Sequence, residues 1–113
     1  MGYSRAVRVG QHVFVSGTTA SSSDGSTVAP GDAYEQAAFI FRKIEAALAA
    51  VGAKRSDVVR TRMFVIDINQ WAEIGRAHGE FFRGIDPAAT MVEVRRLVNP
   101  DHLVEIEVDA VCG

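Results

Sequence analysis

The segment 104–110 alternates strictly between apolar residues and carboxylates, and this pattern constrains the fold more than any other feature of the 113-residue chain. Successive side chains of a β-strand point to opposite faces of the sheet. The apolar residues of the segment must therefore share one face, which predicts a strand packed on a core. The acids must share the other face: Glu105, Glu107 and Asp109. Because the net charge of the chain is only -2, this acidic face indicates a subunit interface or a pocket lined by carboxylates.

Hydrophobic periodicity and turn residues predict the remaining elements. In chain order these are strands at 5–9 and 12–16, a helix at 32–51, a strand at 58–66, a helix at 70–83, and strands at 87–94 and 104–110. A chain of this length is expected to form one domain, residues 1–113. The order β-β-α-β-α-β-β predicts an α+β fold in which one mixed sheet carries both helices on one face.

The first helix has the clearest boundaries. Asp32 is placed to cap its start, with Glu35 three residues later as in a capping box, and Gly52 is placed to end it in a left-handed conformation. An apolar stripe at helical spacing predicts its buried face: Ala37, Phe41, Ile44, Leu48 and Val51. In the second helix, Trp71 and the Phe81-Phe82 pair are expected to pack between helix and sheet.

The residue pattern of the strand at 58–66 bears on whether a second subunit or solvent covers the other face of the sheet. Alternation places Val59, Thr61, Met63 and Val65 on one side and Arg60, Arg62, Phe64 and Ile66 on the other. The second set is too apolar for solvent and too charged for a core. One interpretation is an oligomer that buries this face and pairs its arginines with the acids of the last strand. The alternative is a solvated face with ion pairs worth less than ~1 kcal/mol each.

Composition argues against several classes of protein. No basic stretch forms a footprint for nucleic acid, and no run approaches the ~18 apolar residues of a membrane span. The single cysteine, Cys112, cannot form an internal disulfide, and the N-terminal residues lack the apolar core of a signal peptide. We therefore expect a cytoplasmic protein with no nucleic-acid or membrane partner.

The histidines give no recognisable metal or catalytic constellation. His78 lies within the second helix and is expected to pack or to be partly exposed. His12 and His102 lie at turns and are expected to be solvated.

Several segments, in their order and spacing, resemble the Rid/YjgF family, whose older name is the L-PSP endoribonuclease family. The matching segments are Val13–Gly17, Gln36–Gly52, Asp57–Asp67, the Phe81-Phe82 pair and Pro87–Ala110. The resemblance implies a chorismate-mutase-like fold that assembles as a homotrimer, with small-molecule ligands in clefts between subunits. It also implies hydrolysis of reactive enamines and imines to keto acids and ammonia, without a metal or cofactor.

The resemblance assigns roles to particular positions. Glu105 matches a glutamate that is thought to orient the attacking water, although one extra residue lies in the preceding loop. Ser16 and Gly17 match residues lining the cleft, and Thr90 could offer a hydroxyl there. The position of the arginine that clamps the substrate carboxylate is Ala89, which offers none of the paired charge-assisted hydrogen bonds of a guanidinium. The chain thus resembles an arginine-less branch, to which deamination of 2-imino acids should not be transferred.

Structural readings of the same residues stay open beside these roles. Glu105 could instead form an ion pair across the trimer with Arg60 or Arg62, and Ser16 and Gly17 could simply end a strand.

Three functions follow from these observations. The first is a cofactor-free hydrolase or tautomerase that acts on a small enamine, imine or related amide lacking the usual carboxylate. The second is a non-catalytic homotrimer that binds a metabolite, since the clamp is lost while the scaffold is kept. The third is an endoribonuclease, which the acidic net charge and the lack of a histidine pair disfavour.

Overall fold

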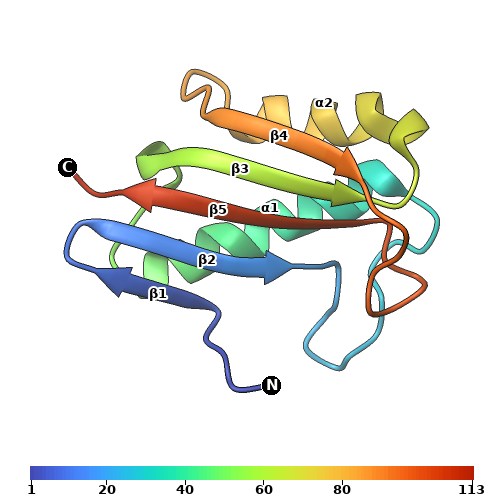
Figure 1. Cartoon of the computed structure of the whole chain (residues 1–113), viewed down its shortest axis with the longest axis horizontal. Coiled ribbons are helices and arrows are strands. Elements are labelled where there is room, and N and C mark those ends of the chain that lie inside the picture. Colours follow the sequence, from blue (N-terminus) through green and yellow to red (C-terminus); the bar gives the residue numbers. More distant parts are fainter.

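A computed structural model describes all residues 1–113, and in it one five-stranded sheet carries both helices on one face (Figure 1). The strands are β1 (Ala6–Val9), β2 (His12–Thr18), β3 (Val58–Val65), β4 (Ala88–Glu93) and β5 (Val104–Val111). The helices are α1 (Ala33–Ala50) and α2 (Trp71–Phe81), with short 3-10 turns at Arg55–Asp57 and Ile68–Gln70. The strand order is β1-β2-β5-β3-β4, with only β3 and β4 parallel. The predicted element order, mixed sheet and one-sided helices are confirmed.

The boundaries of α1 follow its capping residues. The carboxylate of Asp32 accepts a hydrogen bond from the Glu35 amide at 3.0 Å. At the other end Gly52 has a φ of +80°, and the amide of Ala53 donates to the Leu48 carbonyl at 2.9 Å. This is a Schellman ending, which glycine permits because it has no Cβ. Of the predicted stripe, all residues but Val51 are buried.

The alternation that predicted β5 is reproduced in its burial. Val104, Ile106 and Val108 are fully buried against the helices, whereas the three intervening acids are half-exposed on the opposite face. β5 lies between β2 and β3, so its apolar face lies at the centre of the core.

A bulge near the start of β3 makes one part of the predicted strand pattern wrong. Val58 pairs with Ala110 and Arg60 with Asp109, which leaves Val59 as an extra residue on β3. Val58 therefore takes the buried position and Val59 is 47% exposed. From Thr61 onwards the register is regular, and Thr61, Met63 and Val65 face the helices as predicted.

Trp71 does not belong to the core, contrary to the prediction. It is the first residue of α2 and is 61% exposed. The buried residues of the helix are Ile74 and Ala77, so its first turn extends past the core. Phe82 is buried and Phe81 half-buried, and both rings lie 5.1–5.5 Å from the ring of Phe41. Neither helix is long and apolar enough to span a bilayer.

His78 packs into this aromatic cluster, as predicted. Its Nε2 lies 2.8 Å from Thr61 Oγ1 on β3, and its ring lies 4.8 Å from that of Phe82. Burial lowers the pKa of His78 below its ordinary value of 6.5, because the imidazolium ion is poorly solvated there.

The lowered pKa of His78 predicts a loss of stability in mild acid. Below about pH 6.5 the unfolded chain takes up a proton on this histidine that the folded chain resists. The free energy of unfolding therefore decreases as the pH is lowered through this range, and it reaches its full value only above about pH 6.5. His78→Gln cannot titrate and should reduce this slope, which for one proton is at most ~1.4 kcal/mol per pH unit. Urea denaturation between pH 5 and pH 7 measures it. Because burial also lowers the pKa of His102, His102→Gln is the parallel variant; equal slopes in wild type and both variants would contradict the prediction.

Candidate functional site

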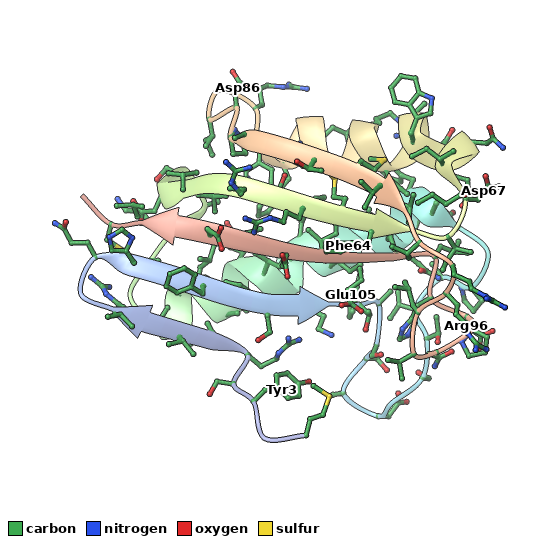
Figure 2. The ribbon with its side chains drawn as sticks, viewed as in Figure 1. Tyr3, Phe64, Asp67, Asp86, Arg96 and Glu105 are labelled. Atoms are coloured by element: carbon green, nitrogen blue, oxygen red, sulfur yellow. The ribbon has the colours of Figure 1, made fainter.

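A cleft of about 760 Å³ opens where β2 ends beside β5. Figure 2 shows Glu105 at this end of the sheet, with Tyr3 on the N-terminal segment and Arg96 on the connection after β4. Its polar lining includes Arg5, Ser16, Lys43, His102, Glu105 and Glu107.

A bulge in β2 forms one wall of the cleft. Val15 pairs with Val108 and Thr18 with Ile106, so Ser16 and Gly17 together oppose one residue of β5. Ser16 is fixed by its hydroxyl, which donates to the Ser4 carbonyl at 2.6 Å. A Cβ on Gly17 would lie 2.3 Å from Glu105 Oε2. Glycine is therefore required if the carboxylate is to occupy its present position, and the predicted grouping of Ser16, Gly17 and Glu105 is seen in the structure.

Glu105 differs from the other acids on the same face of β5. Arg62 Nη1 lies 3.3 Å from Glu107 and 3.2 Å from Asp109 of the same chain. Glu105 has no hydrogen bond or ion pair with any protein group. Arg62, one of the ion-pair partners weighed for Glu105, is thus engaged elsewhere within the chain. A half-exposed carboxylate without a partner can accept a hydrogen bond or a proton from a ligand or a water molecule.

Two cations occupy the same cleft. Arg5 Nη2 donates to the Gly17 carbonyl at 2.8 Å. Lys43 Nζ donates to the carbonyls of Thr19 and Ser21, at 3.0 Å each. Neither residue was predicted from the sequence. The only sequence feature that pointed to Lys43 is its position next to Ile44, a residue of the buried apolar stripe of α1.

His102 is buried, so the prediction of a solvated turn residue is wrong. It is 6% exposed, and its Nε2 lies 3.2 Å from Ser21 Oγ. The buried side chain of Gln36 on α1 holds this loop, donating to the Asp101 carbonyl at 3.0 Å and accepting from the Leu103 amide at 2.9 Å. Burial lowers the pKa of His102 and the charge of Lys43 adds to this shift, while Asp101 and Glu105 oppose it.

Ala89 and Thr90 lie away from Glu105 within one chain. Both are exposed on β4, the edge strand two positions from β5. Ala89 pairs with Thr61, whose side chain faces the helices, whereas Thr90 pairs with Arg62 on the open face. Neither residue lines the cleft. A site that combines them with Glu105 requires a second copy of the chain.

The donor set of the cleft suits acid–base and hydrogen-bonding chemistry. No three His, Cys, Asp or Glu side chains lie close enough to share a metal ion. The groups that line the cleft are a partner-free carboxylate, the His102 imidazole, hydroxyls and two cations.

Fold and cleft together define a class: a small α+β protein whose single sheet leaves one face uncovered and has a polar cleft at its end. The chain belongs to the family described as Endoribonuclease L-PSP, whose model matches residues 1–112, and the predicted Rid/YjgF membership is thereby confirmed.

Three relatives place the chain within this family. A crystal structure of a YjgF/YER057c/UK114 family member from Mycobacterium tuberculosis is 48% identical with a TM-score of 0.87, covering 97% of this chain and 86% of that one. A RutC family protein of Pyrococcus abyssi is 34% identical over 93% of this chain and 82% of its own length. A 2-iminobutanoate/2-iminopropanoate deaminase of Dermatophagoides farinae is 34% identical over 93% of this chain and 81% of its own length.

Proposed function

We propose that this protein is a cofactor-free hydrolase that acts on a small enamine, imine or related compound. The observation that carries the proposal is the Glu105 carboxylate, which faces an open cleft without a protein partner and lies against Gly17. The relative named 2-iminobutanoate/2-iminopropanoate deaminase supports this class of reaction.

The proposed reaction is the addition of water to a carbon–nitrogen double bond. Glu105 accepts a proton from a bound water molecule as its oxygen attacks the imine carbon, and the proton passes to the nitrogen. The carbinolamine hydroxyl then gives up its proton, which Glu105 passes to the amine nitrogen; the C–N bond breaks, the carbonyl forms and ammonia leaves. General base catalysis of this kind contributes about 10²–10⁴-fold.

The active assembly in this proposal is a homotrimer with its sites between subunits. The open sheet face exposes Phe14 (48%) and Val92 (42%), apolar side chains that a second copy would cover. In this proposal Ala89 and Thr90 of one subunit lie near Glu105 of another, because the strand order keeps them apart within one chain.

Ala89 sets the limit of the proposed activity. Its methyl group cannot bind a carboxylate, and a misplaced substrate loses much of the benefit of orientation. We therefore propose that the usual 2-imino acids are poor substrates. The same observation favours a second candidate, a homotrimer that binds a metabolite without turning it over.

The test compares wild type with Ala89→Arg, using 2-iminopropionate generated in the assay and pyruvate release as readout. We expect wild type to match the spontaneous rate and Ala89→Arg to accelerate it at least ~10-fold, since a guanidinium restores a charge-assisted clamp. Ala88→Arg, one residue earlier on the same exposed strand, is the matched control and should not accelerate it. Fast turnover by wild type would overturn the role given to Ala89. If neither chain is active although both fold and assemble, the metabolite-binding alternative is favoured.

A further inference from the structure

Two cations that line the cleft have no acidic partner within the chain. Arg5 and Lys43 have no carboxylate within 4.0 Å among the five ion pairs of the protein. Of the two acids in the same lining, Glu107 is engaged by Arg62 and Glu105 has no partner. Arg5 is close enough to Lys43 to lower the pKa of the lysine, after the larger effect of burial. Two like charges facing one space favour an anion between them.

Both cations are held in place by backbone carbonyls of the β2 bulge and of the segment that follows it. Arg5 bonds to the Gly17 carbonyl, and Lys43 bonds to those of Thr19 and Ser21. An ammonium group has three donors and these two bonds leave one for a ligand. A guanidinium has five donors, so Arg5 retains several. Fixed cations with unused donors form a prepared site, because little side-chain freedom remains to be lost on binding.

We propose that Arg5 and Lys43 form an anion-binding subsite that accepts the carboxylate of the ligand. Nothing in this subsite involves Ala89, which lies on another strand and does not line the cleft. The absence of an arginine at position 89 therefore does not require a neutral ligand, because Arg5 and Lys43 can bind the carboxylate of the ligand instead.

The position of this subsite indicates which acids fit. Glu105 lies against Gly17, whereas Lys43 is bound two to four residues further along, at Thr19 and Ser21. Arg5 is bound at Gly17 itself, beside Glu105, so a ligand carboxylate that contacts both cations must also extend toward Thr19 and Ser21. The ligand class is therefore an oxo or imino acid long enough for its carboxylate to contact both cations while its reacting carbon faces Glu105.

The assignment of this anion to a substrate rests on the proposed function, but the subsite can be tested by binding alone. The probes are 4-oxopentanoate and its methyl ester, which share a skeleton and differ in charge. Chemical-shift titrations with the full chain compare wild type, Arg5→Gln and Lys43→Met. Arg8→Gln is the matched control, because Arg8 also bonds to backbone carbonyls, of Gly10 and Val51, outside the cleft.

We expect wild type and Arg8→Gln to bind the acid alike, and each cleft variant to bind it at least ~10-fold more weakly, as for loss of one charge-assisted hydrogen bond. The ester should bind more weakly than the acid and equally to all chains. Lys43→Arg should recover much of the binding, which separates the loss of charge from a loosened loop. The proposal is overturned if acid and ester bind wild type equally or not at all, if the variants weaken both probes alike, or if they change only the oligomeric mass. Because 4-oxopentanoate has no carbon–nitrogen double bond, its binding tests the subsite alone; binding of the acid together with an inactive Ala89→Arg chain in the pyruvate assay would sustain the subsite and sink the hydrolase.

Discussion

Glu105→Gln is expected to return imine hydrolysis to near the spontaneous rate in the Ala89→Arg background, where 2-iminopropionate should be turned over. Glutamine has nearly the same shape as glutamate but cannot accept the proton of the attacking water, and general base catalysis is worth about 10²–10⁴-fold. The folded state should be little affected, since Glu105 makes no hydrogen bond or ion pair within the chain. Pyruvate release together with a thermal melt measures both quantities.

Asp109→Asn is the matched control for this substitution. It changes an acid on the same face of the same strand that does not line the cleft. Loss of its half-exposed contact with Arg62 should cost less than ~1 kcal/mol of stability and leave the rate unchanged. Equal rates for Glu105→Gln and its parent would remove Glu105 from the mechanism.

Gly17→Ala provides an independent test of the same geometry. The added Cβ would lie 2.3 Å from Glu105 Oε2, so the carboxylate must rotate away while keeping its charge. In the Ala89→Arg background we expect the rate of pyruvate release to fall without a matching change in stability. The reason is that the flexible end of the Glu105 side chain moves and the backbone does not. A fully active Gly17→Ala chain would show that the present position of the Glu105 carboxylate does not matter for the reaction.

Phe41→Ala is expected to cause the largest loss of stability, about 3–5 kcal/mol. Phe41 is 1% exposed and lies at the centre of the ring cluster formed by His78, Phe81 and Phe82. Truncation removes its buried area and leaves a cavity between α1 and α2. Domains of this kind have only about 5–15 kcal/mol in total, so the variant could be largely unfolded at 37 °C.

The measurement is urea denaturation at one fixed protein concentration, since assembly shifts apparent stability. Phe41→Leu, which keeps most of the volume, should cost less than ~1.5 kcal/mol. Trp71→Ala is the contrasting control: it removes a larger ring, but one that is 61% exposed, and should change stability by ~0.5 kcal/mol or less. A Trp71→Ala chain as unstable as Phe41→Ala would mean that a partner surface covers Trp71.

Much of the fold could be predicted from the sequence because its signals are local. The stripe of α1, the Asp32 cap, the ending at Gly52 and the alternation in β5 each depend on neighbours within one element. Such patterns depend on the 3.6- and 2-residue periods of helix and strand. They identified the elements, their order and the buried faces of α1 and β5.

The features that the sequence did not predict depend on contacts between elements. The bulge that exposes Val59 and the one at Ser16 and Gly17 depend on how each strand pairs with β5. His102 was misplaced because Gln36, 66 residues away, ties its loop to α1. No local pattern records either fact.

For the site, the sequence by itself determined that Glu105 shares the open face of β5, while the assignment of Ala89 to the clamp position stays a prediction from the resemblance. Only the tertiary structure decided which groups accompany Glu105. β5 lies between β2 and β3, so β3 separates Glu105 from Ala89 on β4, and the pairing of β5 with β2 places Glu105 beside Gly17. The packing of α1 beneath the β2 end then adds Lys43, and the N-terminal segment adds Arg5. These contacts join residues that are far apart in the chain. They form because the apolar faces of the helices and the sheet pack against one another, and this packing fixes which polar side chains become neighbours.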